Sequence, residues 1–219
     1  MSVVDIHCHI LPGLDDGSPD MATSIAMARL AVTAGITTVI GTPHWIEGEH
    51  ETDPAQVRQT AKDLQVELNS RAIPLTVLTG NEAFICLDLP GRLKKGDILT
   101  LADKRTHLLL ELPYEDLPTY VDDVIFKLQL LGITPVLAHV ERYTYVRSDW
   151  HTLDAWVKRG CLAQVNASSL DRSRGDDLAQ DLVDRGLVDC TATDAHDASH
   201  RVPRSIWNEW SESLLKEER

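Results

Sequence analysis

The stretch DIHCHILPGLDDG, residues 5 to 17, carries two histidines one residue apart and then two adjacent aspartates. His7 and His9 would share one side of a strand, because side chains alternate along extended backbone, and imidazole is a common metal ligand. Asp15 and Asp16 offer carboxylates, although Asp-Asp-Gly is also ordinary turn chemistry. Taken alone, the stretch is compatible both with a metal site and with a structural strand followed by a turn.

Six further side chains of the same chemistry occur later in the chain. They are His44, Glu82, Glu111, His139, Asp194 and His196. A mixture of imidazole nitrogen and carboxylate oxygen suits zinc, manganese or iron, and the shortage of cysteine argues against a structural zinc site. Each residue also has a structural alternative by itself: a lone strand histidine is more often packed than ligating, and a backbone donor could satisfy Glu111.

The elements that must position these residues alternate between apolar, β-rich runs and segments of helical period. Expected strands cover residues 2–8, 36–43, 75–80, 107–112, 133–140, 161–166 and 187–193. Expected helices cover residues 18–35, 53–71, 119–132, 149–160, 176–186 and 203–217, while residues 84–105 have an irregular pattern. This order predicts an α/β fold of βα units around a parallel sheet.

The candidate ligands fall at the carboxyl ends of six of the seven expected strands. A barrel of parallel strands gathers these ends on one face, where active sites of such folds lie. Independent structural roles would not produce this coincidence across separate strands. Five histidines and four carboxylates together predict a centre of two or three divalent ions.

Composition narrows the class of protein. With 219 residues and 43% hydrophobic residues, the chain is expected to form one domain over residues 1–219. It contains neither a membrane-length apolar run nor the pattern of a secretory signal, so we expect a cytoplasmic protein. Its formal charge of −13 argues against a nucleic-acid partner. Four scattered cysteines without a CxxC pair predict no disulfides.

Other histidines and arginines near these runs have different expected roles. His50, His107, His151 and His200 do not follow the strand-end pattern, and we expect them at the surface. Arg142, three residues after His139, has the chemistry to hold a phosphate or carboxylate by a bidentate fork, with a surface ion pair as the alternative. Arg201 and Arg204 are weaker candidates of the same kind.

Taken in order, the motifs resemble a known family. They are DIHCHILPGLDDGS, GTPHW, Gly80-Asn81-Glu82, LLLELP, PVLAHVERY and TDAHD. They resemble the bacterial polymerase-and-histidinol-phosphatase (PHP) superfamily, and within it the manganese-dependent protein tyrosine phosphatases encoded with capsule and exopolysaccharide synthesis proteins. The resemblance runs from about residue 5 to residue 204.

The resemblance implies a distorted seven-stranded (β/α)7 TIM-like barrel with a trinuclear centre, its metal manganese, or else iron or zinc. The implied ligands are His7, His9, Asp16, His44, Glu82, Glu111, His139, Asp194 and His196. Asp16 is preferred to Asp15 only because the family's aspartate directly precedes the glycine. Arg142 is the implied phosphate contact.

The implied reaction is hydrolysis of a phosphomonoester, plausibly phosphotyrosine in a protein such as a bacterial tyrosine kinase, by attack of a metal-bound hydroxide. His44 or His196 could instead protonate the leaving group, but as ligands they would be poorly free to do so. Two positions depart from the family. Trp45 replaces a second histidine after Thr-Pro, and Phe84 replaces an arginine, which affects expected phosphate contacts rather than ligands.

Three other functions compete with this one. A small-molecule phosphatase of the histidinol-phosphatase type would use the same ligands, and a non-catalytic regulatory subunit of polysaccharide assembly would be expected to have lost some of them. Cys86 and Arg92 also have the Cys-x5-Arg spacing of cysteine-dependent tyrosine phosphatases. Asp88 would repel phosphate there and Pro90 removes an amide donor, so we interpret this match as accidental.

Overall fold

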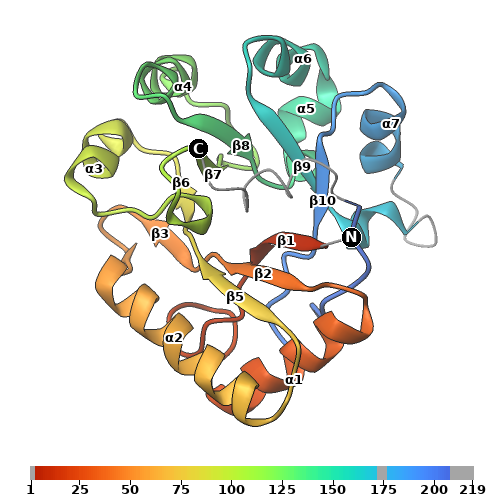
Figure 1. Ribbon diagram of the computed structural model, residues 1–219. Helices are drawn as coiled ribbons and strands as arrows, with labels where there is room; N and C mark the ends of the chain where they lie inside the picture. The colour runs from red at the N-terminus through yellow and green to blue at the C-terminus, as the bar shows by residue number, and fades with distance from the viewer. Residues whose placement is uncertain (1–2, 172–176, 208–219) are drawn as a thin grey trace, which may run out of the picture.

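The computed structural model describes residues 3–171 and 177–207, in which parallel strands lie at the centre and helices around the outside (Figure 1). The strands are β1 (Val4–Cys8), β2 (Thr38–Gly41), β3 (His44–Ile46), β4 (His50–Glu51), β5 (Thr76–Thr79), β6 (Glu82–Phe84), β7 (His107–Glu111), β8 (Thr134–Leu137), β9 (Leu162–Asn166) and β10 (Cys190–Ala192). The α-helices are α1 (Met21–Thr33), α2 (Pro54–Ser70), α3 (Leu89–Lys95), α4 (Val121–Leu130), α5 (Thr144–Ser148), α6 (His151–Lys158) and α7 (Leu178–Asp184). Three short 3-10 helices complete the description: η1 (Leu101–Asp103), η2 (Val140–Arg142) and η3 (Ala167–Leu170).

The strands form two sheets. One has the order β1-β2-β5, and the other has the order β10-β9-β8-β7-β6-β3-β4, with every pair parallel except β3 with β4. The predicted α/β class with a parallel arrangement is confirmed. The predicted (β/α)7 barrel is not, because the hydrogen-bonded ladders of the described residues do not close into one seven-stranded ring.

Two strands of the smaller sheet continue into the larger one. β2 leads into β3 through Pro43, which has no N–H to donate to a ladder, and β5 leads into β6 through Gly80 and Asn81. The chain bends at both places, so one apolar run of the sequence supplies a strand to each sheet. Both bends deliver a candidate ligand, since His44 begins β3 and Glu82 begins β6.

Helix ends follow local chemistry. Asp20 caps α1 by accepting a hydrogen bond from the N–H of Thr23. Asp53 caps α2 by accepting a hydrogen bond from the N–H of Ala55, with Pro54 at the first helical position.

The helices α1 and α2 pack their apolar sides against the smaller sheet, while α3 to α7 cover the larger sheet. A third apolar cluster contains side chains from both sheets, including Ile6 and Leu109, so the sheets share a common interior.

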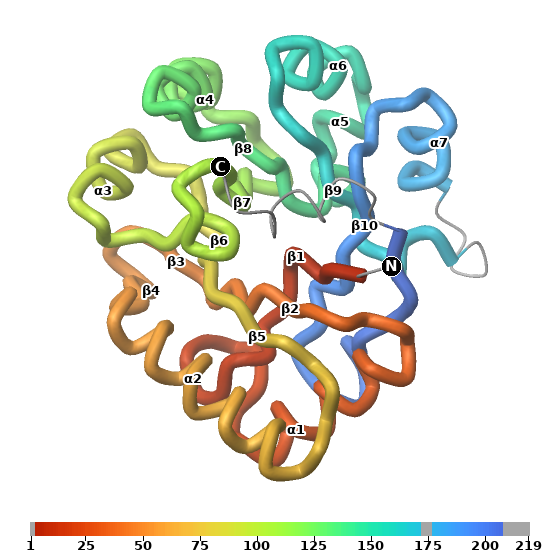
Figure 2. The backbone as a smooth tube through the Cα atoms, viewed as in Figure 1, coloured from red at the N-terminus to blue at the C-terminus, as the bar shows by residue number. Residues whose placement is uncertain are grey.

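The first strand and the end of the last strand meet in space. A parallel bridge joins Cys8 to Ala195, and the N–H of His9 donates to the carbonyl of Ala195 at 2.9 Å. The N–H of Asp194 donates in turn to the carbonyl of His7 at 2.8 Å. Figure 2 shows β1 beside β10 near the centre of the molecule. These bonds bring His7 and His9 to the same place as Asp194 and His196.

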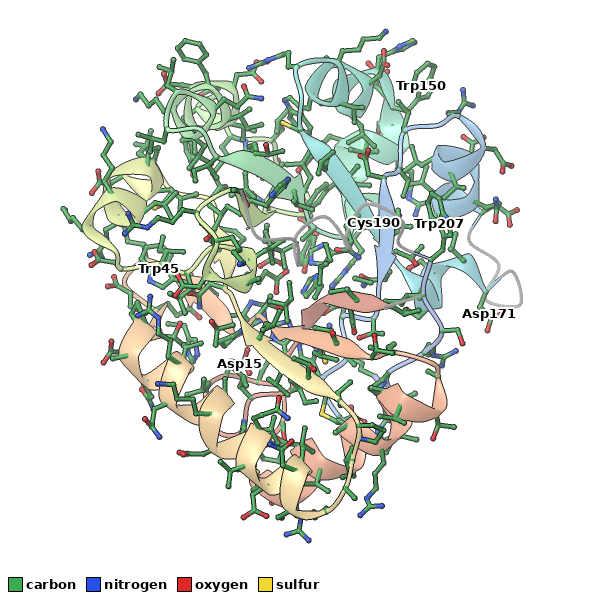
Figure 3. The ribbon with its side chains drawn as sticks, viewed as in Figure 1. Asp15, Trp45, Trp150, Asp171, Cys190 and Trp207 are labelled. Atoms are coloured by element: carbon green, nitrogen blue, oxygen red, sulfur yellow. The ribbon has the colours of Figure 1, made fainter. Side chains whose placement is uncertain are left out.

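Several elements differ from the sequence prediction. The seven expected strands all occur, but β3, β4 and β6 were not predicted, and the irregular stretch 84–105 contains α3 and η1. The helix expected over 203–217 is absent from residues 203–207, and the rest of it lies outside the described residues. Trp207 instead pairs with β10, where its carbonyl accepts from the N–H of Thr191 at 2.8 Å (Figure 3).

Across residues 3–171 and 177–207, no helix combines the length and the apolar character that crossing a membrane requires.

Candidate metal centre

The structure brings all nine predicted ligands together at one end of the strands. Their donor atoms form four overlapping groups, each within 4.8 Å: His9, Asp16, His44 and His196; His7, Glu82 and His139; His7, His9 and Asp194; and His44, Glu82 and Glu111. Most of these side chains are buried, while Asp16 and His44 face the open side. Residues from both ends of the chain therefore contribute to a single cluster.

Glu82 lies at the middle of this cluster. Its Oε2 atom is 3.1 Å from His7 Nε2, 3.2 Å from His9 Nε2 and 3.1 Å from His44 Nδ1. Its Oε1 atom is 2.9 Å from His139 Nε2. The side chain is 1% exposed, so these imidazoles surround a carboxylate that water barely reaches.

Some of these buried atoms have no hydrogen-bond partner among the described residues. They include Glu82 Oε2, His44 Nδ1 and His196 Nε2. Buried polar atoms are normally hydrogen-bonded, so atoms left without partners around one point indicate that something else satisfies them. Imidazole nitrogens and carboxylate oxygens facing a common space are the donor set of divalent metal sites. The residues present fit the expected metal centre.

The charges of the cluster point the same way. Burial lowers the pKa of His7, but the neighbouring carboxylates of Glu82 and Asp194 outweigh that effect and raise its pKa to about 9. When no metal is bound, protonated imidazoles therefore neutralise the negative charge of the carboxylates. Because a metal binds the deprotonated imidazole, it competes with these protons.

The two aspartates of the β1–α1 loop have different roles. Asp16 Oδ1 lies 3.3 Å from His44 Nε2 and 3.4 Å from His196 Nε2, on the exposed side of the cluster. Asp15 (Figure 3) instead accepts hydrogen bonds from His9 Nδ1 at 2.6 Å and from the N–H of His44 at 3.0 Å. Asp16 is thus placed among the candidate ligands, while Asp15 fixes the orientation of His9.

Two candidate ligands have unusual backbone conformations. His139 has φ 32° and Asp194 has φ 49°, in the left-handed region that non-glycine residues rarely adopt. Each is held there by a main-chain bond: the N–H of His139 donates to Gln164 Oε1 at 2.9 Å, and that of Asp194 donates to His7. Local strain of this kind is concentrated at functional sites.

Some residues that hydrogen-bond to the cluster were not predicted from the sequence. β9 ends without a predicted ligand, but its Gln164 lies 3.1 Å from His7 Nδ1, and Asn166 Nδ2 donates to Asp194 Oδ2 at 2.8 Å. Gln164 Nε2 also donates to Asn166 at 2.9 Å. Two amides at alternate positions of an otherwise apolar strand were the available signal, because a buried amide needs partners.

The predicted arginines lie at the rim. Arg142, in η2, is half-exposed with Nη1 3.6 Å from Asp194 Oδ2, and Arg201 Nη2 is 2.8 Å from Asp194 Oδ1. Arg204 lines a small cavity beside Arg201. The acidic chain therefore has cationic groups at the edge of its carboxylate-rich centre.

The remaining histidines lie outside the four groups. His151 and His200 are exposed as predicted, whereas His50 and His107 are half-buried. His50 Nε2 lies 2.5 Å from the carbonyl of Leu14, which ties the β3–β4 hairpin to the loop that carries Asp15 and Asp16. The surface prediction is therefore right for two of these histidines and incomplete for the other two.

A family model for capsular polysaccharide synthesis proteins, CpsB/CapC, matches residues 3–209. The chain belongs to the CpsB/CapC family.

Relatives within this family include the tyrosine-protein phosphatase YwqE of Bacillus subtilis, 40% identical over 202 residues that cover 91% of this chain and 79% of YwqE. The tyrosine-protein phosphatase CpsB of Streptococcus pneumoniae is 27% identical, over 92% of this chain and 86% of CpsB. A solved structure from a study of YwqE and CpsB, described as unique metal-dependent tyrosine phosphatases, superposes with a TM-score of 0.87 at 39% identity, covering 91% of this chain and 82% of that one.

The two positions at which a departure from the family was expected, Trp45 and Phe84, lie beside candidate ligands in this CpsB/CapC member. Trp45 follows His44 on β3, and because neighbours on a strand point to opposite faces, it packs into the core at 1% exposure (Figure 3). Phe84 is half-buried at the end of β6, in register with Glu111. Neither residue displaces a candidate ligand.

The Cys-x5-Arg match does not form a phosphate site in this CpsB/CapC protein. Arg92 is already bound to acids, with Nη2 2.6 Å from Glu51 and Nη1 3.0 Å from Asp97. Burial, with the charge of nearby Glu47, raises the pKa of Cys86 to about 11. A thiolate nucleophile requires a lowered pKa, and this thiol has the opposite shift.

Replacing Cys86 by serine is expected to leave phosphatase activity within about twofold of wild type, because a pKa of about 11 leaves roughly one thiolate in ten thousand at pH 7. Initial rates with p-nitrophenyl phosphate would measure this. Complete inactivation of the folded Cys86→Ser variant would restore the cysteine mechanism.

Proposed function

We propose that the protein is a metal-dependent phosphomonoester hydrolase that removes phosphate from phosphotyrosine in protein substrates. The observation that carries this proposal is the convergence of five histidines and three further carboxylates around buried Glu82. Membership of a family whose relatives are named tyrosine-protein phosphatases supports the substrate class. We also propose a bacterial tyrosine kinase of capsule synthesis as the protein partner and a cytoplasmic location for the reaction, because such a kinase draws on ATP.

The nine clustered side chains are the proposed ligands of two or three divalent ions, with manganese first and iron or zinc as alternatives. When bound, such ions supply Lewis acidity, which lowers the pKa of water and neutralises charge on phosphoryl oxygens. Buried Glu82 and His7 define the inner part of the cluster, and Asp16 and His44 its exposed edge. The substrate phosphate must therefore approach from the side of Asp16.

Phosphate binding and proton donation fall to residues at the exposed edge of the cluster. Arg142 presents a guanidinium whose ion pair with Asp194 is loose at 3.6 Å, so it is available to bind and orient the phosphate through two parallel hydrogen bonds. His44 and His196 are the alternative proton donors to the leaving group. Their nitrogens lie within 3.4 Å of Glu82 or Asp16, which favours ligation over proton transfer. A phenoxide leaving group lessens the need for such a donor.

The test is phosphate release by the purified protein from p-nitrophenyl phosphate and from phosphotyrosine peptides, alongside its metal content. We expect activity that a chelator removes and manganese restores. Activity that persists after the metal has been removed would contradict the metal mechanism. Efficient turnover of histidinol phosphate with none of phosphotyrosine would replace the proposed substrate, and bound metal without any hydrolysis would instead indicate a regulatory subunit.

A further inference from the structure

Tyr114, three residues after Glu111, contacts two different parts of the candidate site. Its hydroxyl donates to Glu111 Oε1 at 2.7 Å. The guanidinium carbon of Arg142 lies 4.4 Å from the centroid of its ring, in the geometry of a cation–π contact. A single side chain therefore touches both a proposed metal ligand and the proposed phosphate-binding arginine.

Among residues 3–171 and 177–207, Arg142 has few other contacts that fix its guanidinium. Its side chain is 40% exposed, and its ion pair with Asp194 spans 3.6 Å, whereas Arg201 reaches the same carboxylate at 2.8 Å. A long exposed side chain has many rotamers, and ordering it on ligand binding is costly. A ring that already covers one face of the guanidinium removes part of that cost before the phosphate arrives.

Tyr114 is itself held firmly. Its carbonyl accepts hydrogen bonds from the N–H of Thr144 at 2.8 Å and from the Thr144 hydroxyl at 3.1 Å. The Tyr143 hydroxyl accepts in addition from the N–H of Leu112 at 3.0 Å. The segment after β7 is thus bonded to the segment directly after Arg142. These hydrogen bonds fasten the backbone that carries the ring to the segment that follows the arginine.

We infer that Tyr114 is a positioning residue that couples the two halves of the site, its ring orienting Arg142 for phosphate and its hydroxyl orienting Glu111 for metal. The inference rests on the proposed function for what Arg142 and Glu111 bind. The two contacts use different parts of the side chain, so substitutions separate them. Phenylalanine keeps the ring and removes the hydroxyl, while leucine removes both.

For Tyr114→Phe, calorimetric titration with manganese should show affinity roughly 10-fold weaker, the lower end of losses for residues that orient ligands. Binding of inorganic phosphate to the manganese-saturated variant should stay within about twofold of wild type. For Tyr114→Leu, phosphate binding should weaken roughly 3- to 30-fold, the range of partly exposed cation–π contacts. The KM for p-nitrophenyl phosphate should rise by a similar factor, with a smaller change in kcat.

A double-mutant cycle separates positioning from general packing. In an Arg142→Ala background, Tyr114→Leu should cause no further loss of phosphate binding, because the group that the ring holds is gone. An equal loss in both backgrounds would overturn the ring contact. Wild-type manganese affinity in Tyr114→Phe would overturn the hydroxyl contact.

Tyr145→Phe is the matched control. Tyr145 stacks on Tyr143 at 5.3 Å, and its buried hydroxyl has no hydrogen-bond partner among the described residues. Both affinities should therefore be unchanged in this variant, and losses equal to those of Tyr114→Phe would contradict the inference. The calorimetric measurements do not need turnover. A wild-type protein that binds manganese and phosphate without hydrolysing any ester would end the proposed function while leaving the test of Tyr114 intact.

Discussion

Glu82→Gln is expected to abolish metal binding and with it phosphatase activity. The substitution keeps the size of the side chain but removes the charge that lies within 3.2 Å of four imidazole nitrogens. Removing one partner from a buried charged set costs about 3–5 kcal/mol, which corresponds to roughly 100- to 5,000-fold in metal affinity. Manganese titration by calorimetry and rates with p-nitrophenyl phosphate measure both effects.

Glu47→Gln is the control for this substitution. Glu47 is 44% exposed, and Arg92 lies 3.6 Å away, so removal of its charge should change neither quantity by more than about twofold. Circular dichroism would establish that Glu82→Gln folds. A folded Glu82→Gln protein that retained the wild-type metal content would show that the cluster is organised around another residue.

Gly17→Ala is expected to damage both stability and the metal site, because a Cβ atom at this position would overlap the Cβ and the carbonyl oxygen of His9. The neighbouring N–H of Ser18 donates to that carbonyl at 3.0 Å, so the loop folds tightly against the end of β1. Relieving the overlap must move Asp15 and Asp16. Overpacking of this kind costs about 1–3 kcal/mol, a fall in Tm of roughly 2–12 °C.

Gly48→Ala separates the two effects. Gly48 has φ +75° with nothing within 4 Å of the added Cβ, so alanine there costs about 1–2 kcal/mol of backbone strain without touching the cluster. Both variants should melt earlier in thermal denaturation, but only Gly17→Ala should lose manganese affinity. Equal manganese affinity in the two variants would mean that the loop does not set the position of its aspartates.

Strands were predictable where apolar runs were long. β7 and β9 are buried on both faces, and such strands appear in a sequence as continuous hydrophobic segments. β3 and β6 have three residues each and begin with a polar candidate ligand, so they show neither alternation nor a run. Their pairing is imposed by the bends at Pro43 and Gly80 and is a tertiary effect.

The end of the described chain shows the same limit. Helical periodicity over 203–217 predicted a helix, but residue 207 is held at β10, where its carbonyl accepts hydrogen bonds from the N–H and from the hydroxyl of Thr191. An exposed strand edge offers unpaired N–H and C=O groups to any extended segment within reach. Local propensity does not report where such an edge lies.

The convergence of the candidate ligands was predictable because imidazoles and carboxylates at strand ends have a recognisable chemistry. The residues that orient them were harder to predict. Asp15 was distinguished from Asp16 only by resemblance, and the hydrogen bond from His9 to Asp15 supplies the physical reason. Gln164 contacts His7 and Tyr114 contacts Arg142 through neutral groups, and both contacts join segments that are separate in the sequence, so they depended on the fold.

The bridge between Cys8 and Ala195 has a consequence for the synthesis of the protein. His7 and His9 are made first, yet the partners that complete their cluster are nearly two hundred residues later in the chain. At 5–20 residues per second, roughly 10–40 s of synthesis separate the two. For most of its translation, the growing polypeptide therefore carries His7 and His9 without the residues that complete their cluster. Binding of the proposed ions must follow release of the last strand, and the newly made protein takes its metal from the pool it meets at that moment.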